Sequence, residues 1–295
     1  MSEESTVIAP GTLYIMATPI GNLGDISSRA LEILHQVDFV LCEDTRHSSI
    51  LLDHYQIRKK LVSYFAHNEA LRTDQFLPRL QAGESAALIT DAGTPGISDP
   101  GSRLVDACLN AGIRVSPVPG ASAVVSAVSA SGFYDFTRFE FVAFFPRKSS
   151  ERKELFESCL HREALLVGYE SPQRIESLLE DLVAVAGPDR RICMCRELTK
   201  KFETIARTTV GALLEEVRLN PVKGELCLVI EGELPKESRD NADLSEEDKK
   251  LALLLKQHGM SARDIKEIVS AYSGVKSKSV YQFLVSECSC SGLTE

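Results

Sequence analysis

The sequence predicts an α/β protein built from two α/β domains, with a small helical appendage at the C-terminal end. Three observations predict this class. Short apolar runs alternate with amphipathic segments over about the first 230 residues, glycine-rich loops follow several of these runs, and residues 248–295 carry only helical patterns. Such alternation is typical of an α/β sheet and not of a β-sandwich or a helix bundle. A chain of 295 residues is long enough for one or two domains with a large core.

The first predicted domain covers residues 11–120. Its apolar runs predict buried strands, beginning with LYIMAT, and its amphipathic segments predict the helices between them. The strands are expected at 13–18, 37–42, 86–90 and 115–117, and the helices at 28–34, 46–54 and 103–111.

The second predicted domain covers residues 121–233 and begins where PVPGAS interrupts the pattern. The strands are expected at 139–145, 165–169, 192–196 and 226–231, and the helices at 121–131, 173–184 and 210–218. An acidic linker follows at 234–247. The appendage, 248–295, shows three short helical patterns with capping signals at 245–248 and 261–264, loosely like a helix-turn-helix. A lid, an RNA clamp or an oligomer contact fits it better than DNA recognition, because only four lysines or arginines fall in 260–285.

Charge and cysteine usage limit the partners. The net charge of −9 is concentrated in residues 231–248, which hold eight acids and two bases, while 146–153 and 189–207 each have a net charge of +3. A nucleic-acid-binding surface is therefore compatible with the charge distribution, although ordinary solvated loops explain that distribution equally well.

The eight cysteines lack the C-x-x-C spacing of a zinc site, and the pair in RICMCR is interpreted as core thiols. With no basic-apolar leader and no apolar run of roughly 18 residues, we expect a cytoplasmic protein without membrane contact.

The loop DAGTPGISDPG (91–101) follows a predicted strand and is the strongest candidate for a ligand site. Arg103 is the only base nearby, which disfavours a phosphate. Asp91 and Asp99 have no recognised metal-ligand spacing and could equally cap turns. The loop 18–27 is neither a dinucleotide fingerprint nor a P-loop. The titratable groups at 43–47 and 67–69 suit acid–base work or a local salt-bridge network. These residues point to a small neutral or cationic ligand without identifying it.

Seven motifs, taken in order, resemble one family. They are GTLYIMATPIGNLGDI, EDTRHSSILL, DAGTPGISDPG, PVPGASA, YESPQR, ELTKKFET and GELCLVIEG, and they cover roughly residues 11–233. They are similar to the small-subunit ribosomal RNA 2′-O-methyltransferase I group, a branch of the tetrapyrrole-methylase-like superfamily. The resemblance implies two α/β domains with S-adenosylmethionine in the cleft between them, no metal, and a homodimer. It also implies methyl transfer to the 2′-hydroxyl of a cytidine in the decoding region of 16S ribosomal RNA, with the RNA or the small ribosomal subunit as partner, and no DNA.

The resemblance also implies site residues. The cofactor is expected beside Pro19, Asp91, Gly93, Thr94, Ile97, Ser122, Ala123, Tyr169 and Ala206. Thr94 stands where the tetrapyrrole branch has aspartate, which favours the ribosomal branch. A ribose hydroxyl is a poor nucleophile, so a base within hydrogen-bond reach would assist. The candidates for catalysis are Glu43, Asp44 and His67, with Arg46 to hold a phosphate or orient the carboxylates. The predicted basic loop places Arg147, Lys148, Arg152 and Lys153 against RNA phosphates. A same-fold methyltransferase acting on a tetrapyrrole or another small molecule, and a non-catalytic RNA-binding protein, remain alternatives.

Overall fold

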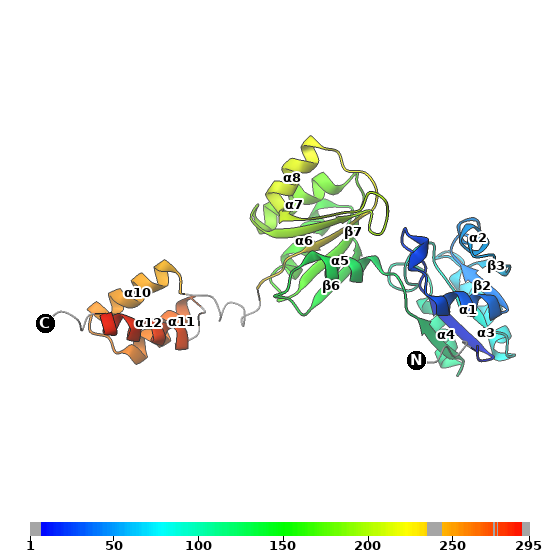
Figure 1. Cartoon of the computed structure of the whole chain (residues 1–295), viewed down its shortest axis with the longest axis horizontal. Helices are drawn as coiled ribbons and strands as arrows, with labels where there is room; N and C mark the ends of the chain where they lie inside the picture. The colour runs from blue at the N-terminus through cyan, green and yellow to red at the C-terminus, as the bar shows by residue number, and fades with distance from the viewer. Residues whose placement is uncertain (1–6, 235–243, 274, 276, 291–295) are drawn as a thin grey trace. The chain divides into compact units, whose positions relative to one another are not determined.

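The computed structural model describes residues 7–234, 244–273, 275 and 277–290. The chain divides into two compact units, and Figure 1 labels the helices and strands along it. One consists of Met1–Gly132, Phe141–Phe156 and Val167–Ile230, and the other of Phe133–Glu140, Glu157–Leu166 and Glu231–Glu295. Two five-stranded sheets with their helices, followed by C-terminal helices, confirm the predicted α/β class. The predicted domain boundaries stay a prediction.

The first sheet has the strand order β3-β2-β4-β1-β5, and its pairings are parallel. Its strands are β1 (Thr12–Met16), β2 (Phe39–Cys42), β3 (Lys60–Ser63), β4 (Ala86–Leu88) and β5 (Arg114–Val118). Leu13 of β1 lies opposite both Ala86 and Val115. Because the strands are parallel, the loops that follow β1, β2 and β4 leave the sheet at the same edge.

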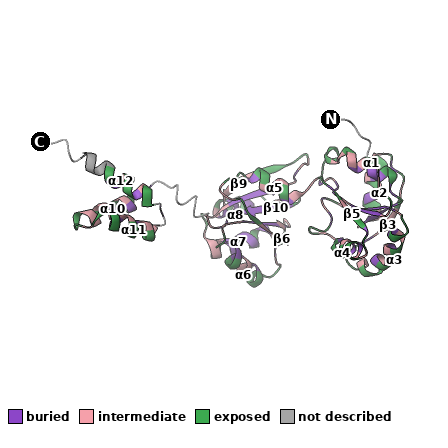
Figure 2. Ribbon diagram, turned by 90° about the horizontal axis from the view of Figure 1, so that it is seen from below, coloured by how far each residue is buried: buried purple, intermediate pink, exposed green. Residues whose placement is uncertain are grey.

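Helices cover both faces of this sheet, and its three central strands β1, β2 and β4 are buried (Figure 2). The helices are α1 (Ser28–Gln36), α2 (Thr45–His54), α3 (Glu69–Gln81) and α4 (Ser102–Asn110). One core cluster joins the strands to α1 and α2 and includes Met16 and Ile33. The other joins them to α3 and α4 and includes Leu13 and Phe76. Because successive side chains of a strand point to opposite faces of the sheet, Leu13 packs into one core and Met16 into the other, and one apolar run contributes to both.

The second sheet has the strand order β6-β7-β10-β8-β9. Its strands are β6 (Phe139–Phe144), β7 (Leu165–Glu170), β8 (Arg191–Arg196), β9 (Thr204–Thr209) and β10 (Leu226–Ile230). β8 lies between β10 and β9 and is antiparallel to both. The accompanying helices are α5 (Ala123–Ser131), α6 (Ser149–Cys159), α7 (Ile175–Ala186) and α8 (Val210–Leu219).

The C-terminal helices form a small core of their own. They are α10 (Glu246–Gln257), α11 (Ala262–Ser273) and α12 (Ser277–Cys290). Ala252, Ile265, Val269 and Val280 are buried among them. The predicted capping signal at the start of α10 is confirmed, because Ser245 and Asp248 form a complete capping box.

The predicted strands and helices of both sheets are all present, with differences of a few residues at their ends. The sequence reasoning did not predict β3, α3, α6 or β9. The predicted basic loop is therefore wrong from residue 149 onward, where α6 begins. No helix within the described ranges is long and apolar enough to cross a membrane.

Candidate functional site

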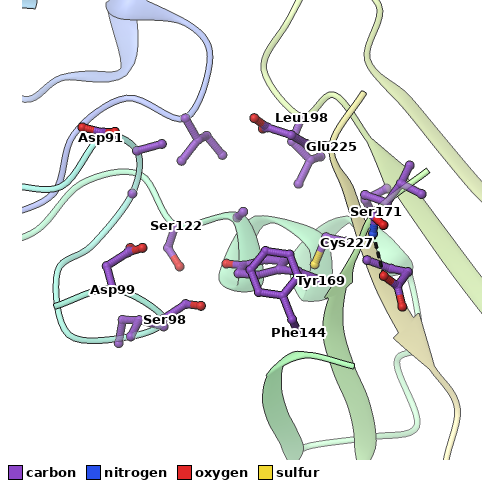
Figure 3. A pocket seen from close by; sticks show the side chains of 18 of the residues that line it. Asp91, Ser98, Asp99, Ser122, Phe144, Tyr169, Ser171, Leu198, Glu225 and Cys227 are labelled. Carbon is purple, nitrogen blue, oxygen red and sulfur yellow. Dashed lines mark hydrogen bonds between the residues drawn. The ribbon is translucent and has the colours of Figure 1, made fainter. Parts of the chain in front are cut away.

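A cavity of about 430 Å³ lies in the unit that holds the two sheets (Figure 3). One side is formed by the loops after β1, β2 and β4, including Ile20, Glu43 and residues 91–94 and 97–99. The other side is formed by residues of β7, β8 and β10 and their neighbours, including Tyr169 and Cys195. Sheet edges of this kind are where ligands of α/β proteins bind.

The glycine-rich loop 91–101 is fixed to its surroundings by backbone contacts. Gly93 and Thr18 exchange two backbone hydrogen bonds of 2.9 and 3.0 Å. The Thr94 hydroxyl donates to the carbonyl of Ala121 at 3.2 Å, which ties the loop to the start of α5. Gly93 has φ +83°, a conformation that L side chains rarely adopt. The loop therefore needs glycine here for its backbone shape, and the lack of a side chain also keeps the cavity wall open.

Carboxylates give the cavity its electrostatic character. Glu43, Asp91 and Asp99 all line it, and no lysine, arginine or histidine is among the described residues that do. Burial, followed by the nearby charges of Asp91 and Asp99, raises the pKa of Glu43. Burial and Asp91 likewise raise the pKa of Asp99. The cavity thus favours a cationic ligand, which relieves the repulsion among these groups.

The opposite wall is largely apolar and aromatic. The ring of Tyr169 makes edge contacts with Phe141 and Phe144, at centroid distances of 5.2 and 5.5 Å. Burial raises the pKa of the Tyr169 hydroxyl, and burial raises the pKa of the Cys227 thiol to about 12. Both groups are therefore neutral near pH 7, and this wall can hold a flat apolar ring (Figure 3).

Several residues that the sequence reasoning named lie around this cavity. They are Glu43, Asp91, Gly93, Thr94, Ile97, Ser122, Ala123 and Tyr169. Pro19 instead borders a smaller cavity of about 80 Å³, which shares Asp91 with the larger one. Ala206 lies on β9 opposite Met194 and is not among the lining residues. Their roles toward a cofactor stay predictions.

Only one of the four candidates for catalysis lines the cavity. Glu43 lines the cavity, while Asp44, Arg46 and His67 do not. Asp44 caps α2 through the Arg46 backbone and accepts from the Arg46 guanidinium at 2.6 Å, and these hydrogen bonds lower its pKa far below the usual range. His67 is exposed, with its ring against Phe65.

The basic residues proposed for RNA divide in a similar way. Arg147 and Lys148 are exposed, and Lys148 pairs with Glu151 at 2.9 Å. The side chain of Arg152 is only 4% exposed and pairs with Asp181, itself 9% exposed. The prediction that Arg152 contacts phosphates is wrong, because its guanidinium is buried and bonded within the protein. Lys153 remains 43% exposed, at 3.4 Å from Asp181.

Sequence reasoning missed a further set of lining residues. They include Ser98, Phe144, Ser171, Leu198, Glu225 and Cys227. Most come from the second sheet and its loops, where no local motif marks a side chain as facing a cavity. The motifs YESPQR, ELTKKFET and GELCLVIEG contain four of them, so these quoted stretches were the available signal.

Comparison with known proteins places the chain in a family. The model of the tetrapyrrole (corrin/porphyrin) methylases matches residues 12–214. The chain belongs to this family. A protein named ribosomal RNA small subunit methyltransferase I from Haemophilus influenzae is 45% identical over 92% of this chain and 96% of its own length. The protein of the same name from Escherichia coli O157:H7 is 41% identical over 96% of this chain and 98% of its own.

Solved structures of family members share the fold. A uroporphyrin-III C-methyltransferase from Thermus thermophilus matches with a TM-score of 0.54 and 22% identity, covering 74% of this chain and 94% of that one. A structure of the Thermus thermophilus enzyme in complex with S-adenyl homocysteine matches with a TM-score of 0.53 and 16% identity over 75% and 97%. Among the described residues of the chain, no group of three or more His, Cys, Asp or Glu side chains could hold a metal ion.

Proposed function

We propose that this chain is a methyltransferase that uses S-adenosylmethionine to methylate the RNA of the small ribosomal subunit. The similarity to proteins named ribosomal RNA small subunit methyltransferase I carries the proposal, since it reaches 45% identity over nearly the whole of both chains. The finer proposal is 2′-O-methylation of a cytidine in the decoding region of 16S RNA. The enzyme is proposed to act in the cytoplasm as a homodimer.

The cavity fits the proposed cofactor. S-adenosylmethionine is a cation, and five carboxylates line the cavity without a base among its described lining residues. Glu170 and Glu225 are paired with Arg174 and Lys200, whereas Glu43, Asp91 and Asp99 lie together on the opposite side. The aromatic and thiol wall suits an adenine ring, and the volume of about 430 Å³ is within the usual range for a small-molecule site. When bound, the cofactor supplies an electrophilic methyl group on its sulfonium. The backbone of 91–101, held by Thr18 and Ala121, would orient it.

Glu43 is the proposed general base. It stands directly after β2, and of the named candidates it alone lines the cavity. Its raised pKa makes it a stronger base than an ordinary carboxylate, so it can accept the proton as the 2′-oxygen attacks. Asp44 is proposed to act structurally, because its carboxylate is held by Arg46 and by the N-terminus of α2. The remaining rate enhancement comes from holding the acceptor oxygen in line with the methyl group.

The acceptor RNA needs cationic groups near the cavity. Arg147 and Lys148 are exposed at the end of β6 and are proposed to contact phosphates. A ribose hydroxyl must be presented outward for methylation, so an unpaired or bulged nucleotide is the expected form of the substrate.

The test uses tritiated S-adenosylmethionine and small ribosomal subunits from a strain without this modification. We expect tritium in 16S RNA, recovered after digestion as 2′-O-methylcytidine, and a Glu43→Gln variant should label it far more slowly. Label on the base of the nucleotide would refute the 2′-O assignment. Label on a precorrin with none in RNA would refute the whole proposal.

A further inference from the structure

The loop between β8 and β9, residues 197–203, borders the cavity and carries exposed groups that the proposed reaction has not used. Leu198 lines the cavity and is 9% exposed. Four residues later Phe202 is 65% exposed, more than any other phenylalanine among the described residues. The adjacent Lys201 is also exposed, with its ammonium 5.5 Å from the centre of the Phe202 ring. At about 3.5 Å per residue, Phe202 stands within roughly 14 Å of the cavity wall.

The loop is held in one shape by its own hydrogen bonds. The Glu203 carboxylate accepts from the Thr199 backbone at 2.6 Å, and Glu203 donates its own backbone N–H to the carbonyl of Lys200. Glu197 and Thr199 have φ of +51° and +66°, which is rare for residues other than glycine and costly for a β-branched one. A strained shape of this kind persists only where the surroundings enforce it.

Lys200 fixes the loop to the rest of the unit. Its ammonium lies 3.0 Å from Glu197 and 2.9 Å from Glu225, a residue of the cavity lining. Its side chain also fills the space in which a Cβ at Gly21, in the loop after β1, would lie. Lys200 is therefore occupied in positioning the loop, which leaves Lys201 and Phe202 as the groups it presents outward.

We propose that Phe202 and Lys201 form a docking point for the RNA, where a base of the acceptor strand stacks on the Phe202 ring and a neighbouring phosphate contacts Lys201. This inference rests on the proposed function. An exposed aromatic ring beside a cation is the pair of groups that binds single-stranded nucleic acid, because every base has a π-face and every linkage a negative charge. Because Leu198 lines the cavity, a strand that delivers a ribose there can reach this loop. Within the loop, Lys200 is paired with Glu197 and Glu225 and the Glu203 carboxylate is bonded to the Thr199 backbone, so Lys201 is the cation that the loop offers to a phosphate.

The test measures binding of in vitro transcribed, unmodified 16S RNA and of unmodified small subunits. Phe202→Ala and Phe202→Leu should each raise the Kd and the KM for RNA about tenfold, whereas Phe202→Tyr, which keeps a ring, should bind like the wild type. Affinity for S-adenosylmethionine, measured by calorimetry, should not change. Tyr134→Ala is the matched control, because Tyr134 is an exposed aromatic residue (87%) that does not line the cavity.

Salt dependence separates the two groups. Lys201→Ala should reduce the slope of log Kd against log salt by about one, while Phe202→Leu should weaken binding without changing that slope. Wild-type binding by both Phe202→Ala and Phe202→Leu would overturn the inference. So would weaker binding to the small subunit with unchanged binding to free RNA, because the ring would then contact a ribosomal protein. If the wild type bound RNA without transferring a methyl group, the proposed function would be refuted. The effect of the Phe202 variants on RNA binding would still test the docking point.

Discussion

Replacing Arg152 with alanine should lower the free energy of unfolding by more than the replacement of a solvent-exposed charged residue does. The guanidinium donates to Asp181 at 2.8 and 2.5 Å, and also to the carbonyls of Pro146 and Arg147 at 3.3 and 2.9 Å. Both side chains of the ion pair are more than nine-tenths buried. Loss of the arginine therefore leaves a buried carboxylate with only Ser149 and the more distant Lys153 as partners.

The expected magnitude follows from this burial. Removing one partner of a buried ion pair costs about 3–5 kcal/mol, because the other charge stays desolvated. For 150–250 residues that unfold together, each kcal/mol lowers Tm by about 2–4 °C, so Arg152→Ala should melt roughly 6–20 °C below the wild type. Differential scanning calorimetry measures this directly.

Two controls define the comparison. Arg162 and Glu140 form an ion pair with side chains 55% and 37% exposed, and Arg162→Ala should cost less than about 1 kcal/mol. The double variant Arg152→Met/Asp181→Leu removes both buried charges and should recover most of the lost stability. A loss for Arg152→Ala no larger than that for Arg162→Ala would refute the reasoning.

The same pair predicts a pH dependence. Burial opposes ionisation of Asp181, but hydrogen bonds from Ser149 and Arg152 outweigh it and hold its pKa below the ordinary 3.8. A carboxyl whose pKa is lowered by folding contributes stability above its unfolded pKa and loses it as pH falls toward the folded one. The difference in unfolding free energy between the wild type and Arg152→Ala should therefore be largest near pH 7 and shrink as the pH falls toward the folded-state pKa of Asp181 in the wild type.

Three further predictions concern the cavity and the RNA. Asp99→Asn removes one of the charges that raise the pKa of Glu43, so the pH below which methyl transfer declines should shift downward; an unchanged profile would argue against Glu43 as the base. Gly93→Val places a branched residue at φ +83° in the cavity wall, and calorimetry on the folded variant should show at least tenfold weaker binding of S-adenosylmethionine, with equal affinity contradicting the proposed site. Replacing both Arg147 and Lys148 with alanine should weaken RNA binding and reduce the salt slope by up to two while cofactor affinity is kept, and a wild-type slope would exclude these residues from phosphate contact.

Strands buried on both faces, and the loops that follow them, could be predicted from the sequence, because continuous apolar runs and glycines are local signals. The run LYIMAT could be assigned as a strand because its first four residues, 13–16, pack alternately into the cores on the two faces of the sheet. β9 could not, since its sequence TIARTT is exposed or half-buried and has no apolar run. The helix α3 was hidden in a polar segment that even contains Pro78.

The candidate site could not be predicted fully from the sequence, because it depends on pairing between residues that are far apart in the chain. Arg152 lies in a basic stretch and looks solvated, and only the carboxylate of Asp181, 29 positions away, makes it a buried group. Glu43 and His67 could not be ranked as candidate bases from the sequence, because no local pattern reveals that Glu43 faces a cavity and His67 faces solvent. The positive φ of Glu197 in ELTKKFET could not be predicted from local propensity either, since Glu197 is held by hydrogen bonds with Glu225, 28 positions away.

The position of β1 within its sheet affects how the chain is made as well as how it is held. Leu13, near the start of the chain, finds its neighbours only at Ala86 and Val115, so the first strand emerges from the ribosome long before either partner exists. At about 5–20 residues per second, roughly 5–20 s pass before β5 has been synthesised. During that time β1 has no strand partner, and an apolar strand with unpaired edges is the kind of segment that pairs with other chains and aggregates.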